Sequence, residues 1–253
     1  MITFSEAQLM AWLTPVLWPF IRVLALFQAM PVFGQRLVPV RVRIGLSFLI
    51  AVAAGGIAPE MPVVALDSSA AVLLVIQQLL VGLALGFAVR IVFTAVEFAG
   101  ELAGLQMGMN FAGFFDPISA TQATATSRFF GTLVAFLFIA INGHLTVIHA
   151  VVQSLVVFPV GPEPFAFLRA TQPQVWGSEI FSLGLWIALP MVAMLLFVNL
   201  VLGVISRVAP QSNIFSIGFP ITMGIGLVGM MLMLPLLEMP FVASLERMLA
   251  PFR

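Results

Sequence analysis

Long apolar runs alternate with short polar interruptions along the whole chain. The apolar runs cover residues 6–30, 44–58, 70–109, 129–158, 180–206 and 217–237. Within them, apolar residues follow one another continuously, without the every-second-residue alternation of a membrane-spanning strand. This pattern favours helices over a membrane β-barrel. It predicts an all-α integral membrane protein with about six hydrophobic helical segments, forming a single membrane domain over residues 1–253.

Several of these segments are predicted to be kinked or broken. Pro15 and Pro19 interrupt the first run and Pro190 the fifth, and a proline inside a spanning helix kinks it. Asn142-Gly143 divides the run 129–158, which predicts two half-helices or one strongly bent helix. The run 44–58 is short for a span, which needs roughly 20 residues.

Composition narrows the class of protein further. The chain is 62% hydrophobic and 8% charged, with a mean hydropathy of +1.17, whereas about a quarter of the residues in soluble domains are charged. Its net charge of zero argues against a nucleic-acid partner. It has no cysteine, which excludes disulfides, thiolate nucleophiles and Cys-ligated metals. No basic residue precedes the first apolar run, so we expect that run to stay in the membrane rather than act as a signal peptide.

One stretch, residues 100–128, is too polar and broken for a lipid-facing helix and too apolar for an ordinary exposed loop. Irregular backbone at membrane depth is tolerated only where protein or a water-filled cavity surrounds it. Methionine fills irregular gaps, and apolar constrictions can close pores by dewetting. We therefore expect a deformable hydrophobic seal, with ordinary helix packing as the alternative; its residues are Met107, Met109, Phe111, Phe114 and Phe115.

Glycines and charged residues accompany this stretch. Gly100, Gly104 and Gly108 recur every four residues, a spacing typical of helix-packing faces. Glu97 and Glu101 lie one helical turn apart, where like charges repel. The prediction is that Glu97, Glu101, Asp116 and Arg128 form ion pairs that support the loop. A water-filled path or a proton-carrying pair is the alternative.

Two other sets of polar residues are candidate sites. Arg22 lies inside the first apolar run, so it must face protein, water or an acidic partner. His144 and His149 are five residues apart, which does not place them on one helix face. No catalytic, metal-binding or nucleotide-binding motif accompanies them. The sequence therefore predicts no catalytic, cofactor-binding or metal site.

Four motifs follow one another along the chain. They are Gly104-Leu105-Gln106-Met107-Gly108, Phe111-Ala112-x-Phe114-x-Asp116-Pro117, Asn142-Gly143-His144, and Arg207-x-x-Pro210-Gln211-x-Asn213-Ile214-Phe215-x-x-Gly218-Phe219-Pro220. In this order they resemble the motifs of the FliR family of flagellar export-gate proteins, and length and segment order also agree over essentially the whole chain. We expect the last motif to serve assembly, through Arg207, Pro210, Gln211, Asn213, Phe215, Gly218, Phe219 and Pro220.

The resemblance implies a multi-pass, non-enzymatic subunit of the flagellar type III secretion export gate. It would sit in the bacterial inner (cell) membrane at the flagellar basal body and serve flagellum biosynthesis, by forming and plugging the channel for unfolded flagellar proteins. Implied partners are FliP-type and FliQ-type subunits, FlhB-type and FlhA-type export components, membrane lipid and the exported cargo. Residues 1–178 would be FliP-like, with a plug loop at 105–126, and residues 179–253 would form a FliQ-like helical hairpin.

Other functions stay open at this point. An ion-coupled small-molecule secondary transporter could use Glu97, Glu101 and Arg128 around broken helices. Its expected sign is paired inverted repeats, of which the chain shows only a weak R-x-x-P echo at 36–39 and 207–210. The corresponding subunit of a virulence type III secretion system is a second alternative. A membrane enzyme is the weakest, because nucleophile and metal motifs are missing.

Overall fold

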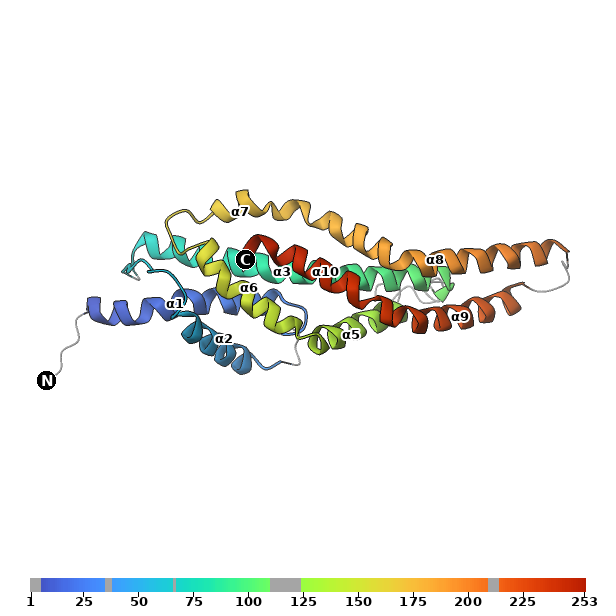
Figure 1. The fold of residues 1–253 in the computed structure, drawn as a ribbon, viewed down its shortest axis with the longest axis horizontal. Coiled ribbons are helices and arrows are strands. Elements are labelled where there is room, and N and C mark those ends of the chain that lie inside the picture. The colour runs from blue at the N-terminus through green and yellow to red at the C-terminus, as the bar shows by residue number, and fades with distance from the viewer. Residues whose placement is uncertain (1–5, 35–37, 66, 110–123, 209–213) are drawn as a thin grey trace. The chain divides into compact units, whose positions relative to one another are not determined.

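The computed structural model describes residues 6–34, 38–65, 67–109, 124–208 and 214–253, and every regular element in them is a helix (Figure 1). This confirms the predicted all-α class. In chain order the helices are α1 (Glu6–Ala29), α2 (Val40–Ala54), α3 (Ser69–Gln106), α5 (Ala125–Ala140), α6 (Gly143–Val157), α7 (Ala166–Thr171), η3 (Pro173–Val175), α8 (Gly177–Val208), α9 (Ile214–Met233), η4 (Leu234–Leu236), α10 (Glu238–Leu249) and η5 (Ala250–Phe252).

The predicted break in the run 129–158 is confirmed, and it falls at Asn142. This residue has φ 57° and ψ 29°, the left-handed conformation that asparagine tolerates better than most residues. The Asn142 N–H donates to the Ile139 carbonyl at 3.1 Å, and the Asn142 carbonyl accepts from the Leu145 N–H at 2.9 Å. Helix α5 therefore ends at Ala140, and α6 begins at Gly143, directly after the left-handed Asn142.

Four helices in the described part of the chain are long and apolar enough to cross a membrane. They cover Met10–Ala29, Ser69–Gln106, Pro173–Val208 and Ile217–Leu236, and the pair α5–α6 would count as a fifth span. Helix α2 has 15 residues, hence a length of about 22 Å at 1.5 Å per residue. That is shorter than the hydrocarbon layer of about 30 Å, as the sequence predicted for this segment.

The chain folds into two compact units. The first unit comprises Met1–Ile91, Ile139–Trp176 and Leu245–Arg253, and the second comprises Val92–Phe138 and Gly177–Ser244. Helices α3, α5 and α10 each contribute residues to both units. The division at residue 178 expected from the sequence concerns likeness to other subunits, and it stays a prediction.

In the first unit, α1 packs against α2 and closely against α3. The close approach to α3 occurs at Gly82 and Gly86. A Cβ on Gly86 would lie 2.5 Å from Ala29 Cβ and 2.8 Å from the Leu26 carbonyl oxygen. Glycines four residues apart on one helix face permit such a close approach. The fully buried Trp18 anchors an adjoining apolar cluster with Ala71, Leu74 and Val160.

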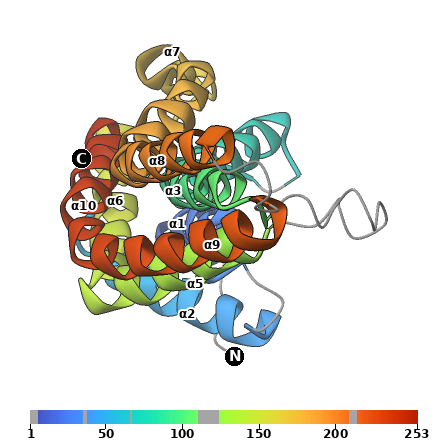
Figure 2. The ribbon, with the colours of Figure 1, turned by 90° about the vertical axis from the view of Figure 1, so that its right-hand side faces the viewer.

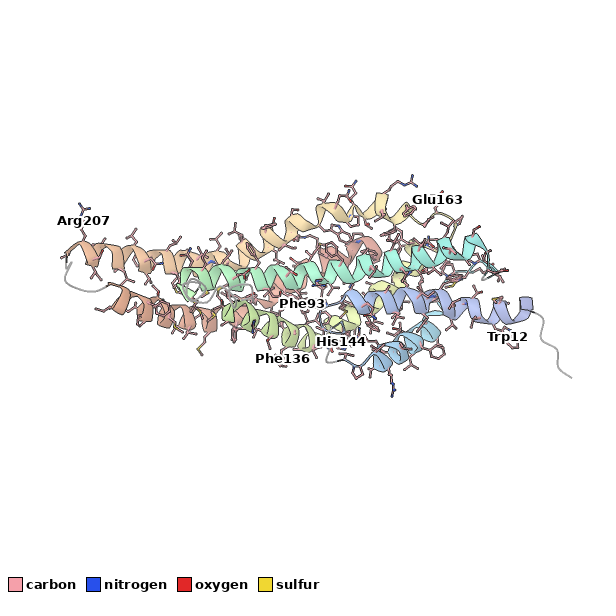
Figure 3. The ribbon with its side chains drawn as sticks, turned by 180° about the vertical axis from the view of Figure 1, so that it is seen from behind. Trp12, Phe93, Phe136, His144, Glu163 and Arg207 are labelled. Carbon is pink, nitrogen blue, oxygen red and sulfur yellow. The ribbon has the colours of Figure 1, made fainter. Side chains whose placement is uncertain are left out.

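Aromatic rings form the centre of the second unit. Phe93 on α3 makes edge-to-face contacts with Phe138 on α5, at 5.4 Å between centroids, and with Phe241 on α10, at 5.6 Å. Phe136, labelled with Phe93 in Figure 3, lies on the outside of α5 and is 72% exposed. Helices α8 and α9 run antiparallel and pack against each other (Figures 1 and 2).

Candidate functional site

The most deeply buried charge among the described residues is Arg22, in the C-terminal half of α1, whose exposed fraction is 0%. Its Nε donates to Gln78 Oε1 at 2.8 Å. Its Nη1 donates to the Ser154 carbonyl oxygen at 2.6 Å and to Ser154 Oγ at 3.0 Å, and its Nη2 donates to the Phe158 carbonyl oxygen at 2.9 Å. The guanidinium therefore joins α1 to α3 and to the last turn of α6.

The network continues along α3 into the turn that follows α6. Gln78 Nε2 donates to Gln77 Oε1 at 2.9 Å, and the same oxygen accepts from the Gly161 N–H at 3.1 Å. Gln77 Nε2 in turn lies 3.3 Å from the Pro159 carbonyl oxygen and 3.4 Å from that of Glu163. Two adjacent glutamines thus tie the turn 158–163 to the same helix that holds Arg22.

Helix geometry explains how Arg22 is accommodated without a carboxylate partner among the described residues. The last carbonyls of a helix have no partner within it and carry partial negative charge. The Phe158 carbonyl is such a group at the end of α6, whereas the Ser154 carbonyl already accepts from the Phe158 N–H at 2.9 Å and offers Arg22 its second lone pair. A cation at this helix end is therefore stabilised by both carbonyls. The sequence predicted only that Arg22 faces protein, water or acid. Gln77, Gln78 and Ser154 were missed, although a Gln pair within an apolar helix is a usable signal.

A second arrangement lies in the second unit, where α3 ends. Met107 directly follows α3, its N–H donates to the Ala103 carbonyl at 3.0 Å, and its side chain is fully buried. That side chain covers Gly226 of α9: a Cβ on Gly226 would meet Met107 Cγ at 2.5 Å and Sδ at 2.6 Å. Gly108 then takes φ 77°, a left-handed conformation suited to glycine. We call Met107 and Gly108 the N-terminal stem of residues 110–123.

The C-terminal stem, Thr124 to Thr126, is fixed to the same helix. Thr124 Oγ1 accepts from the Ser127 N–H at 3.2 Å, which caps the start of α5. The side chain of Thr126, 3% exposed, contacts the backbone of Gly104, where any Cβ would clash. A Cβ on Gly100 would lie 2.8 Å from the Phe130 ring. Gly100 and Gly104 therefore let α5 approach α3 closely, whereas Gly108 lies in the turn after the helix.

The structure places part of the predicted seal and of its charged surroundings. Met107 is buried and Met109 is half-buried, while Phe111, Phe114, Phe115 and Asp116 lie outside the described residues. Glu97 is half-buried against α5, because a Cβ on Gly131 would lie 2.9 Å from its Oε1. The side chains of Glu101 and Arg128 are exposed. Their role in supporting the loop stays a prediction.

The predicted assembly motif spans the connection between α8 and α9. Arg207 is exposed in the last turn of α8 (Figure 3). Gly218 is buried in α9, and Phe219 and Pro220 of the same helix are exposed. Pro210, Gln211 and Asn213 lie outside the described residues, as does the side chain of Phe215. The assembly role of this motif also stays a prediction.

Neither unit presents a metal-binding cluster in its described part. No group of three or more His, Cys, Asp or Glu side chains there is placed to hold a metal ion. A groove of about 210 Å³ in the second unit is lined by apolar residues of α8, η4 and α10 and by Met233 at the end of α9. These features describe a helical, multi-span membrane protein whose buried polar groups hold helices together.

Comparison with known proteins identifies the family. The family described as bacterial export proteins, family 1, matches residues 13–248. The flagellar biosynthetic protein FliR of Escherichia coli (strain K12) is 42% identical over 250 residues, which cover 97% of this chain and 93% of that protein. FliR of Pectobacterium carotovorum subsp. carotovorum is 41% identical with the same coverage. FliR of Bacillus subtilis (strain 168) is 30% identical over 216 residues, which cover 83% and 82% of the two chains.

The chain belongs to the FliR family of bacterial export proteins. It is a non-enzymatic component of the flagellar type III export apparatus of the inner membrane, with several membrane-spanning helices. This confirms the family resemblance of the four motifs. It also displaces the small-molecule transporter and the membrane enzyme as functions.

Proposed function

We propose that this chain forms part of the export channel and closes it with the apolar stretch around residues 107–117. The observation that carries the proposal is the pair of stems. Met107 and Thr126 are buried at opposite ends of residues 110–123 and both belong to the second unit. A Met- and Phe-rich segment held at both ends can present apolar side chains to a narrow passage and exclude water from it.

The partners proposed from the resemblance are FliP-type and FliQ-type subunits, together with FlhB-type and FlhA-type export components. Helix α2 supports contact with such subunits. It is too short to cross the bilayer, yet it exposes a continuous apolar face that includes Phe48, Leu49 and Val52. Large exposed apolar patches mark interaction surfaces, and partner subunits would remove this one from water. Unfolded flagellar proteins are the proposed cargo.

The test removes the proposed seal and leaves its stems in place. Phe111→Ala and Phe114→Ala are combined in the full chain, which is produced together with its partner subunits. We expect the complex to assemble in normal amount and the membrane to become leaky to small ions, because smaller side chains no longer dewet the passage. Ion efflux from membrane vesicles measures the leak, and recovery of the purified complex measures assembly.

A matched control makes the same chemical change away from the stretch. Phe129 and Phe136 are exposed on α5, so Phe129→Ala with Phe136→Ala should leave efflux unchanged. Efflux that stays at the wild-type level in the Phe111/Phe114 variant, with the complex intact, would contradict a sealing role. Uptake of a small solute by the purified chain alone would instead favour a transporter.

A further inference from the structure

The contact between Met107 and α9 has features that ordinary core packing does not require. Met107 is fully buried and its side chain occupies the space above Gly226, with Cγ, Sδ and Cε all within 2.8 Å of where a Cβ would stand. One turn earlier on α9, Thr222 Oγ1 lies 3.4 Å from the Met107 carbonyl oxygen and 3.1 Å from that of Phe219. Side chain and backbone of Met107 thus both meet the same face of α9.

The backbone conformation of Gly108 links the position of Met107 to that of the residue that follows. It is the next residue, and its φ of 77° is one that only glycine adopts at low cost. Its N–H donates to the Leu105 carbonyl at 3.1 Å, which closes the turn at the end of α3. The position of Met109, the next residue, therefore depends on where Met107 is held.

We propose that Thr222 and Gly226 form an anchor on α9 that fixes Met107 and so positions Gly108 and Met109, where the chain leaves α3. Gly226 is a positioning residue in this scheme: it acts only through Met107. The anchor itself is defined by described contacts alone. Any effect of the anchor on ion leakage rests on the proposed function.

The glycines of α9 supply a graded set of variants. At Gly226 an added methyl would displace Met107, and at Gly229 it would meet Met194 of α8. At Gly224 the same methyl would meet nothing within 4 Å. Gly226→Ala therefore tests the anchor, Gly229→Ala tests general overpacking of α9, and Gly224→Ala controls for replacing glycine in this helix.

The readout is the accessibility of position 109 in the assembled complex. The natural chain has no cysteine, so Met109→Cys gives this chain a single thiol, whose rate of maleimide labelling can be followed by mass. We expect Gly226→Ala to raise that rate about tenfold, since overpacking shifts side chains and backbone. Gly224→Ala and Gly229→Ala should each stay within about twofold of the parent, because Met107 is untouched.

A double-mutant cycle separates the anchor from a general loss of packing. Met107→Ala removes the side chain that an alanine at position 226 would displace. If the two residues form one anchor, Gly226→Ala adds no further labelling in the Met107→Ala background, so their effects do not multiply. Multiplying effects, an equal rise with Gly229→Ala, or no rise with Gly226→Ala would each overturn the anchor.

Ion efflux distinguishes failure of the anchor from failure of the proposed function. Faster labelling together with greater efflux in Gly226→Ala supports both. If Gly226→Ala labels faster but ion efflux stays at the wild-type level, both in this variant and in the Phe111/Phe114 variant, the anchor is upheld and the seal is refuted. Unchanged labelling refutes the anchor whatever the efflux shows. Recovery of the intact complex is required of every variant and is measured on the same preparation.

Discussion

The two units hold their helices together by different chemistry. In the first, Arg22, Gln77 and Gln78 reach backbone and side-chain groups far away in the sequence through hydrogen bonds of 2.6–3.4 Å. In the second, large side chains pack directly against glycines of neighbouring helices, as Met107 does against Gly226 and Phe98 against Gly184. Aromatic edges around Phe93 fill the centre.

This difference predicts how each unit responds to change. A buried polar network tolerates loss of a member poorly, because each orphaned donor or acceptor keeps its full desolvation cost. Contacts between glycine and methionine change gradually, because methionine has three rotatable side-chain bonds and refills space. The first unit is accordingly suited to rigid support. The second is suited to carry the stretch that is proposed to open and close.

Loss of Arg22 should have the largest effect. Arg22→Met keeps most of the volume but removes the Arg22 donor from Gln78 Oε1 and from the Phe158 carbonyl, while the Ser154 carbonyl keeps the Phe158 N–H. At about 1–3 kcal/mol for each orphaned group, we expect a loss of about 3 kcal/mol or more. The measurement is the thermal stability of the purified complex, with the amount of chain in the membrane as a second readout. Arg22→Lys keeps the charge and loses the planar fork, so it should fall in between.

Arg90→Met provides the control, because Arg90 is exposed on α3. It should leave stability within about 0.5 kcal/mol of the parent, as surface substitutions usually do. Equal losses from Arg22→Met and Arg90→Met would mean that the buried network is no more important than surface charge. That result would contradict the inference that the first unit depends on its buried polar network.

Local patterns in the sequence predict the helices well, and long-range partners poorly. The break at Asn142 and the shortness of α2 follow from nearby residues, because glycine, asparagine and run length act locally. The partners of Arg22 could not be predicted, since Gln78 lies 56 and Ser154 lies 132 residues away. Nothing near Met107 indicates Thr222, which is 115 residues further along. Glycines within a helix indicate where another element can pack closely, but they do not indicate which element packs there.

Adding the same methyl group in each unit sharpens the comparison. Gly86→Ala in the first unit would meet Ala29 Cβ at 2.5 Å and the Leu26 carbonyl oxygen at 2.8 Å, atoms that cannot turn aside. Gly229→Ala in the second would meet mainly the terminal Cε of Met194, which can rotate away. We expect Gly86→Ala to cost about 1–3 kcal/mol and Gly229→Ala about 1 kcal/mol or less.

Thermal stability of the complex measures both variants under the same conditions. Gly56→Ala, in the turn after α2, is the control for the first unit, because an added Cβ there meets nothing within 4 Å. Gly224→Ala serves the second unit for the same reason. A greater cost for Gly229→Ala than for Gly86→Ala would show that methionine does not make the second unit more tolerant.

The smallest effect is expected where charge lies at the surface of the first unit. Arg169 Nη2 and Glu163 Oε2 are 3.7 Å apart, and both side chains are at least 75% exposed. Solvent screens such a pair, so Glu163→Gln should change the stability of the complex by no more than about 0.5 kcal/mol, and salt should alter that little. The Glu163 backbone carbonyl stays beside Gln77 Nε2 in this variant. A loss well above 1 kcal/mol would mean that the exposed Glu163 carboxylate, and not the buried Gln77, supports the turn 158–163.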